Sequence, residues 1–276
     1  MSTIKLYLYI HKIYARIRRN LIHEVKRVSS TLLELDQRIA ERARFKQRSH
    51  DTHVNVHISQ LKIINLTSSD NSVSSEHHSS QIDIVLIGSS AIERFQTTGQ
   101  NTQLGQLHYP QIFNGGVGGD KIENVLYRVN LGLFRLLKPH NPKVVVLLIG
   151  TNNLRPNQAL KQQHLDDYYL LLQAILRDFP IRTQILILGF SKRKDVNEQR
   201  MMQSNSAIKE LVTKVNQEKM ESQMQQQHRV HWMNSPEQIG WEHLEDNLHL
   251  NANGYKIWDA VLYRMIQKLL ITYDSG

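Results

Sequence analysis

The chain has 276 residues, is 40% hydrophobic and carries a net charge of +9, which fits one globular domain with an extension. It contains no cysteine, so disulfides and thiolate metal sites are excluded, and no apolar run reaches the roughly 18 residues of a membrane span. These features predict a soluble cytoplasmic protein, with mitochondrial targeting by the basic N-terminus as a minor alternative.

The positive charge is concentrated in residues 1–50, which hold 12 Lys and Arg against 4 Asp and Glu. Apolar residues recur there at steps of three and four, as on one face of a helix; they are Ile10, Ile13, Ile17, Leu21, Val25, Val28, Leu32, Leu35 and Ile39. We therefore predict a basic amphipathic helical extension. It could pack on the following domain or on a second copy, form a coiled coil with a partner, or lie on a membrane surface. Nucleic-acid binding is disfavoured, because no basic surface with interleaved aromatic residues is present.

Residues 51–80 are expected to form a mostly polar, mobile linker. The serine-rich stretch 66–81 has too little apolar surface to offset its ordering entropy, whereas VNVHISQLKIINL at 54–66 shows an alternation typical of a strand. The histidine pairs His53/His57 and His77/His78 could suggest a metal site. No further acid or histidine lies at matching helical spacing, so we interpret them as solvated side chains.

From residue 82 onward, short apolar runs of the kind found in buried parallel strands alternate with helical segments. Strands are expected at 82–88, 143–149, 184–190 and 230–234, with a further strand end at Ile112 and Phe113; helices are expected at 120–137, 157–179, 199–221 and 253–272. Such alternation predicts an α/β fold, with helices on both faces of a parallel sheet. Ligands bind these sheets outside the carboxyl ends of the strands, so the residues that follow each strand are candidate site residues.

Those strand ends carry a serine pair, a glycine block and an asparagine pair, and an acid and a histidine precede the last helix. The four motifs are Ser89-Ser90, NGGVGGDK at 114–121, Gly150-Thr151-Asn152-Asn153 and the loop with Asp246 and His249. A histidine can remove a serine proton only if its other ring nitrogen is held by an acceptor, such as a nearby carboxylate. The glycine block lacks the spacing of a phosphate-binding P-loop or of a dinucleotide-binding fold. The motifs therefore predict acyl transfer by a serine nucleophile.

The order GSSA (88–91), GGVGGD (115–120), GTNN (150–153) and DNLH (246–249) resembles the four blocks of the SGNH, or GDSL-type, hydrolases. Within that family, VLYRV at 125–129 and the Asn141-Pro142-Lys143 approach to GTNN are most similar to the catalytic alpha subunits of intracellular platelet-activating-factor acetylhydrolase. The resemblance implies an SGNH hydrolase domain at 81–276. It also implies a three-layer, flavodoxin-like five-stranded parallel sheet in the order 2-1-3-4-5.

Carried over by position, the resemblance implies that Ser90 is the nucleophile, His249 the base and Asp246 the acid that orients it. The N–H of Gly119, the side-chain amide of Asn152 and the N–H of Ser90 would form the oxyanion hole. Such donors stabilise the charge that acyl transfer places on a carbonyl oxygen. The chain departs from the family at Ser89, where an aspartate is usual, so a catalytically degenerate member stays an open alternative.

The resemblance further implies hydrolysis of carboxylic esters with a small acyl group, such as acetyl, on a lipid-like or simple alcohol, without metal or organic cofactor. Carbohydrate acetylesterase or lysophospholipase-type activity on the same machinery is an alternative, as is a noncatalytic interaction subunit. A homo- or hetero-oligomer could form through the N-terminal helix or the hydrolase domain. Trp232 and Trp241, near the acid–histidine loop, could line an acyl pocket or pack in the core.

Overall fold

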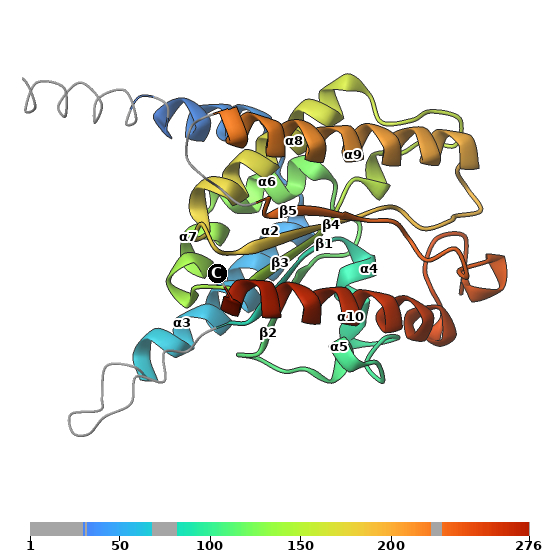
Figure 1. Cartoon of the computed structure of the whole chain (residues 1–276), viewed down its shortest axis with the longest axis horizontal. Helices are drawn as coiled ribbons and strands as arrows, with labels where there is room; N and C mark the ends of the chain where they lie inside the picture. The colour runs from blue at the N-terminus through green and yellow to red at the C-terminus, as the bar shows by residue number, and fades with distance from the viewer. Residues whose placement is uncertain (1–29, 31, 68–81, 222–227, 276) are drawn as a thin grey trace, which may run out of the picture.

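A five-stranded parallel sheet lies at the centre of the molecule (Figure 1). The computed structural model describes residues 30, 32–67, 82–221 and 228–275. Its strands are β1 (Ile84–Gly88), β2 (Ile112–Gly116), β3 (Val144–Leu148), β4 (Gln184–Leu188) and β5 (Val230–Met233), in the order β2-β1-β3-β4-β5. The predicted α/β class and flavodoxin-like strand order are confirmed.

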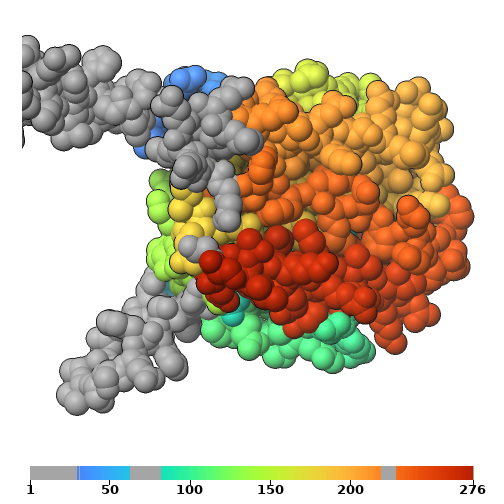
Figure 2. Space-filling model, viewed as in Figure 1, coloured from blue at the N-terminus to red at the C-terminus, as the bar shows by residue number. Residues whose placement is uncertain are grey.

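Helices cover both faces of this sheet, so every residue of β1, β3 and β4 is buried. That burial explains why these strands are continuous apolar runs without alternation. The longer helices are α6 (Ile122–Asn130), α8 (Gln162–Asp178), α9 (Glu198–Glu221) and α10 (Ala252–Ser275), and the short ones α4 (Ser90–Glu93), α5 (Gln103–Gln106) and α7 (Leu133–Leu137). Helices α6 to α9 lie on one side of the sheet and α10 lies with α4 and α5 on the other (Figure 1). In the space-filling view, α10 forms a continuous band across the face of the molecule (Figure 2).

The helix predicted at 120–137 is interrupted. It divides into α6 and α7 at Gly132, whose φ of +99° is left-handed. Glycine enters this region without a Cβ clash, so the chain ends one helix there and begins the next. The remaining single-turn segments are η2 (Arg94–Gln96), η3 (Lys138–His140), η4 (Thr151–Asn153) and η5 (Trp241–His243).

The prediction of a strand at 54–66 and of a polar linker from residue 51 is wrong for the part that the structure describes. This part is helical throughout, as α2 (Gln47–Thr52), a π-helical turn η1 (His53–His57) and α3 (Ile58–Thr67). Ser49, His53, His57 and Leu61, each four residues after the last, are all at most 2% exposed. This spacing is that of one helical face, which packs near β2, α6 and α7.

His53 and His57 are therefore core side chains and not solvated ones. Burial lowers the pKa of His53 to about 4 and that of His57 to about 3, and the positive charge of Arg128 contributes in the same direction. The second pair, His77 and His78, lies outside the described residues, as does the serine-rich stretch 68–81.

The end of the predicted amphipathic helix is described, and it packs on the domain. Residues 32–42 are helical, Ile39 is buried, and Leu35 packs at the edge of the core. Arg42 forms an ion pair with Asp167 of α8, and Asp36 lies 2.6 Å from Arg177 of the same helix. Residues 1–29 lie outside the described part. Among the described helices, none is long and apolar enough to cross a membrane.

Candidate active site

Three loops meet at the carboxyl edge of the sheet because the strand ends are in register. Gly88, at the end of β1, pairs with Gly116 of β2 on one side and with Leu148 of β3 on the other. The serine pair begins one residue beyond the end of β1, the glycine block runs from within β2 past its end to Lys121, and the asparagine pair begins four residues beyond the end of β3. The parallel register thus brings motifs far apart in sequence to one place.

His249 connects Ser90 with Asp246. Its Nε2 lies 2.9 Å from Ser90 Oγ, and its Nδ1 lies 2.6 Å from Asp246 Oδ2. The other oxygen of Asp246 accepts the backbone N–H groups of Leu248 and His249, each at 2.7 Å. The carboxylate is thus held by hydrogen bonds from residues two and three positions away.

These hydrogen bonds fix the charge state of Asp246. Burial is the largest single influence and raises its pKa, but the donors of His249 and Leu248 together outweigh it and hold the pKa well below the usual range. An ionised carboxylate can only accept, so Nδ1 carries the imidazole proton and Nε2 presents its lone pair to Ser90 Oγ. The arrangement can remove a proton from Ser90.

The two adjacent serines differ in their surroundings. Ser90, the first residue of α4, is 8% exposed and contacts His249. Ser89 is fully buried, and its Oγ has no hydrogen-bond partner within the described part of the chain. Of the two hydroxyls, Ser90 is therefore the one within reach of the histidine.

The predicted oxyanion donors lie on neighbouring loops. Gly119 has a left-handed φ of +75°, a conformation that glycine adopts readily. The side-chain amide of Asn152 donates to the backbone oxygen of Asp120 at 2.9 Å, which ties the asparagine loop to the glycine block. The next residue, Asn153, accepts the N–H of Ile122 at 3.1 Å and donates to Glu123, which fixes the start of α6.

A small cavity of about 30 Å³ lies beside Ser90 and His249. The remaining residues that line it are mostly apolar: Ala91, Leu148, Thr151, Phe190, Ser191, Leu248, Leu250 and Trp258. Neither tryptophan singled out from the sequence belongs to it, since Trp232 lines a neighbouring cavity and Trp241 is exposed. Trp258 lies on α10, and only the packing of that helix brings it to the site.

Arg193 is a further residue that the sequence did not indicate. Its guanidinium donates to the backbone and side-chain oxygens of Thr151 and pairs with Asp195. The N–H of the next residue, Lys194, donates to the backbone oxygen of Asn247 at 2.7 Å. This loop joins the asparagine block to the acid–histidine loop. The sequence gives no motif that singles out Arg193, and a charged residue in a loop is most often solvated.

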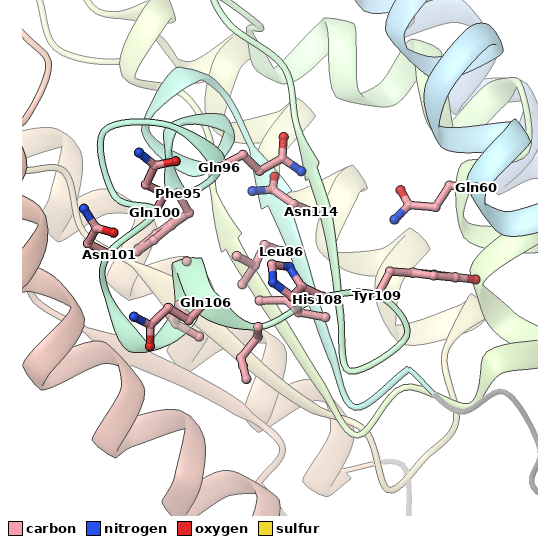
Figure 3. Close-up of a pocket in the computed structure, with 14 residues that line it drawn as sticks. Gln60, Leu86, Phe95, Gln96, Gln100, Asn101, Gln106, His108, Tyr109 and Asn114 are labelled. Atoms are coloured by element: carbon pink, nitrogen blue, oxygen red, sulfur yellow. The ribbon is translucent and has the colours of Figure 1, made fainter.

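A separate cavity of about 390 Å³ lies near α5 and β2, and no triad residue lines it (Figure 3). Amide side chains surround it, among them Gln60, Gln96, Gln100 and Asn114. Asn114 donates to the backbone oxygen of Ile92 on α4 and accepts the N–H of Gly116. It therefore ties the helix that begins at Ser90 to the end of β2. Among the described residues, no group of three His, Asp or Glu side chains could hold a metal ion.

Comparison with known proteins identifies the family of the chain. Residues 87–257 match the model of the GDSL-like Lipase/Acylhydrolase family. The platelet-activating factor acetylhydrolase IB subunit alpha2 of Homo sapiens and that of Bos taurus are each 26% identical over 189 residues, which is 68% of this chain and 77% of the relative.

Two solved structures share the fold. The psychrotrophic esterase EstA from Pseudoalteromonas sp. has a TM-score of 0.51 at 14% identity, over 68% of this chain and 98% of that chain. A family two carbohydrate esterase from Clostridium thermocellum has a TM-score of 0.52 at 15% identity, over 73% and 67%. Since the family match spans more than half of the chain, the protein belongs to the GDSL-like lipase/acylhydrolase family and is a serine ester hydrolase.

Proposed function

We propose that the protein hydrolyses carboxylic esters of small acyl groups, acetyl above all, through an acyl-enzyme on Ser90. The observation that carries this proposal is the cavity of about 30 Å³ beside Ser90 and His249. A single water needs a cavity volume of roughly 10–15 Å³, so this cavity has room for about two water-sized groups. Its size and mostly apolar lining suit a methyl or ethyl group better than a fatty acyl chain.

The reaction follows from the contacts of His249. Nε2 takes the proton of Ser90 Oγ while Oγ bonds to the ester carbonyl carbon, and the carbonyl oxygen becomes negative between the N–H groups of Ser90 and Gly119 and the Asn152 amide. His249 then gives its proton to the leaving alcohol oxygen as the ester bond breaks. A water loses a proton to His249, attacks the acyl carbon and releases the acid, and Ser90 regains its proton. Asp246 stays ionised throughout.

Phe190 limits the length of the acyl group. It lines both the small cavity and a larger one of about 370 Å³, which has Met201, Met202 and Trp232 on its walls. Asn205 holds the backbone of Phe190 on both sides, accepting its N–H at 2.8 Å and donating to its carbonyl at 3.2 Å. Because Phe190 lines both cavities and its backbone is held, we infer that its ring forms the boundary between them and that its loss would join them.

The acyl-length profile tests this proposal. For p-nitrophenyl esters from acetate to octanoate, we expect kcat/KM of the wild type to fall as the chain lengthens. Phe190→Ala should shift the octanoate-to-acetate ratio of kcat/KM by about tenfold or more, since each buried methylene contributes about 1 kcal/mol or more to discrimination.

Phe179→Ala is the matched control, because Phe179 is buried to a similar extent, packs on Phe134 and lies away from both cavities. It should lower stability and leave the ratio unchanged. A wild type that prefers octanoate would refute the small acyl group. An unchanged ratio in Phe190→Ala would remove Phe190 as the boundary.

A further inference from the structure

Residues 32–67, the described N-terminal part of the chain, contact the glycine loop, residues 117–120. Lys46 Nζ donates to the backbone oxygen of Gly118 at 2.7 Å and lies 3.3 Å from Asp120 Oδ1. A methyl group placed on Gly119 would come within 2.9 Å of Lys46 Nζ. The ammonium group therefore lies directly against the residue whose N–H is the proposed oxyanion donor.

Asp120 is the point where these contacts converge. Its side chain is fully buried; it accepts the hydroxyl of Ser49 at 2.9 Å and lies 3.0 Å from the buried guanidinium of Arg128. Its backbone oxygen accepts the Asn152 amide. One residue thus links the N-terminal part to both Gly119, its chain neighbour, and Asn152, the two donors proposed for the negative oxygen.

A second contact reaches the nucleophile helix. Arg48 lies 2.9 and 3.0 Å from the two carboxylate oxygens of Glu93, which is three residues after Ser90 on α4. The side chain of Arg48 is 60% exposed, so solvent screens this pair and its contribution is small. Lys46 differs, because it makes a charge-assisted bond to a backbone oxygen, its side chain is 31% exposed, and the Asp120 carboxylate that it faces is fully buried. Of these two cations, Lys46 is therefore the one that contributes more to the position of the loop.

We propose that Lys46 is a positioning residue for ester hydrolysis. It holds the glycine loop in the conformation that directs the N–H of Gly119 at the oxyanion. Lys46 lies before the family match, which spans residues 87–257, so the active site would include a residue from outside that match. A glycine-rich loop has many backbone conformations, and a donor contributes fully to catalysis only if it is already in place when the charge develops. The inference rests on the oxyanion role proposed for Gly119.

The test compares Lys46→Met, which keeps an unbranched apolar stem but removes the charge, with Lys46→Arg and wild type. For p-nitrophenyl acetate we expect Lys46→Met to lower kcat about ten- to hundredfold, less than loss of a whole oxyanion donor, with KM changed by no more than about twofold. Lys46→Arg should recover most of kcat, because it restores a cation that can donate to Gly118. The matched control is Lys62→Met on α3, an exposed lysine of the same N-terminal part, which should retain wild-type kcat.

The melting temperature and fluorophosphonate labelling of each variant separate the outcomes. A kcat of Lys46→Met equal to that of wild type, or a loss that Lys46→Arg does not reverse, would overturn the inference. A loss that only matches a decreased folded fraction would also overturn it, as it would show a structural role alone. A folded wild type that is neither active nor labelled would instead refute the proposed function, whatever Lys46 does.

Discussion

Two loops at the edge of the sheet are held in place by different kinds of contact. The acid–histidine loop is nearly self-contained: Asp246 accepts from Leu248 and His249, and the N–H of Glu245 donates to the backbone oxygen of His249. The glycine loop depends on Lys46 and Ser49, which are more than 70 residues upstream, and on Arg128. The first loop can form its geometry from a few adjacent residues, whereas the second needs the rest of the fold.

The difference shows where the active site is vulnerable. Local hydrogen bonds between adjacent residues re-form with little loss of chain entropy, while contacts between distant segments depend on the packing of everything between them. Changes to the N-terminal part should therefore disturb the glycine loop and leave the acid–histidine loop in place. Substitutions in the two loops can separate their contributions.

The largest effect should come from the triad itself. Ser90→Ala and His249→Ala should each lower kcat/KM for p-nitrophenyl acetate by roughly 10⁴–10⁶-fold, because each removes a group that acts at the reacting atoms. Both should also abolish labelling by a fluorophosphonate. Ser89→Ala is the control for the adjacent hydroxyl, whose Oγ is buried without a partner among the described residues; it should be labelled as wild type is. Labelling that survives in Ser90→Ala and disappears in Ser89→Ala would move the nucleophile by one residue.

The contact between Asp246 and His249 was predictable from the sequence for the same reason that this loop is nearly self-contained. Asp246 and His249 are three residues apart, so their spacing alone indicates a contact. The buried strands could also be predicted from the sequence, because they are continuous apolar runs flanked by glycine. The strand order could not be derived from such local patterns and came from the family resemblance.

The residues that sequence reasoning missed act through distant contacts. The alternation V-N-V-H at 54–57 fits a strand locally, but packing near β2 and α6 buries positions four apart and selects a helix. The spacing of Ser49, His53, His57 and Leu61 was the available signal, hidden because three of the four are polar. Lys46, just before α2, and Trp258, on α10, carry no local signal at all, since their contacts form only once α2 and α10 pack on the domain.

Gly119→Ala tests the glycine loop directly. The backbone there has φ +75°, which is strained for any residue with a Cβ, and an added Cβ would lie 2.9 Å from Lys46 Nζ and displace that ammonium group. We expect kcat for p-nitrophenyl acetate to fall about 10²–10³-fold, as when one oxyanion donor is lost. Gly132→Ala is the matched control: its φ is +99°, but the nearest neighbour of an added Cβ is 3.8 Å away and the site is remote. It should cost about 1 kcal/mol of stability and no activity. Equal kcat values for Gly119→Ala and Gly132→Ala would mean that the glycine loop does not contribute to catalysis.

A smaller effect concerns the helix that follows Lys46 and holds it near the glycine loop. His57 of this helix is buried against Phe113, and its pKa is lowered to about 3 by burial, with Arg128 and His53 as the charged or ionisable neighbours that contribute. An ordinary histidine titrates near pH 6.5, so the unfolded chain binds more protons than the folded one at acid pH. The stability that His57 provides is thus complete above pH 6.5 and is lost as the pH falls toward 3. By pH 4.5 the loss should be about 2–3 kcal/mol.

Urea unfolding from pH 7.5 to 4.5 measures this loss. Because His57→Phe also changes the packing against Phe113, the comparison is between the pH dependences of the free energy of unfolding and not between its absolute values. The free energy of unfolding of His57→Phe should fall less over this range than that of wild type, by about the 2–3 kcal/mol that one buried histidine contributes. His108→Phe, at an exposed histidine, should keep the wild-type slope. If His57→Phe also keeps it, the helix does not unfold with the domain, and the N-terminal part would be an independent unit. The glycine loop would then be held by residues that can detach from it, and the difference between the two loops would become one of dynamics as well as of contacts.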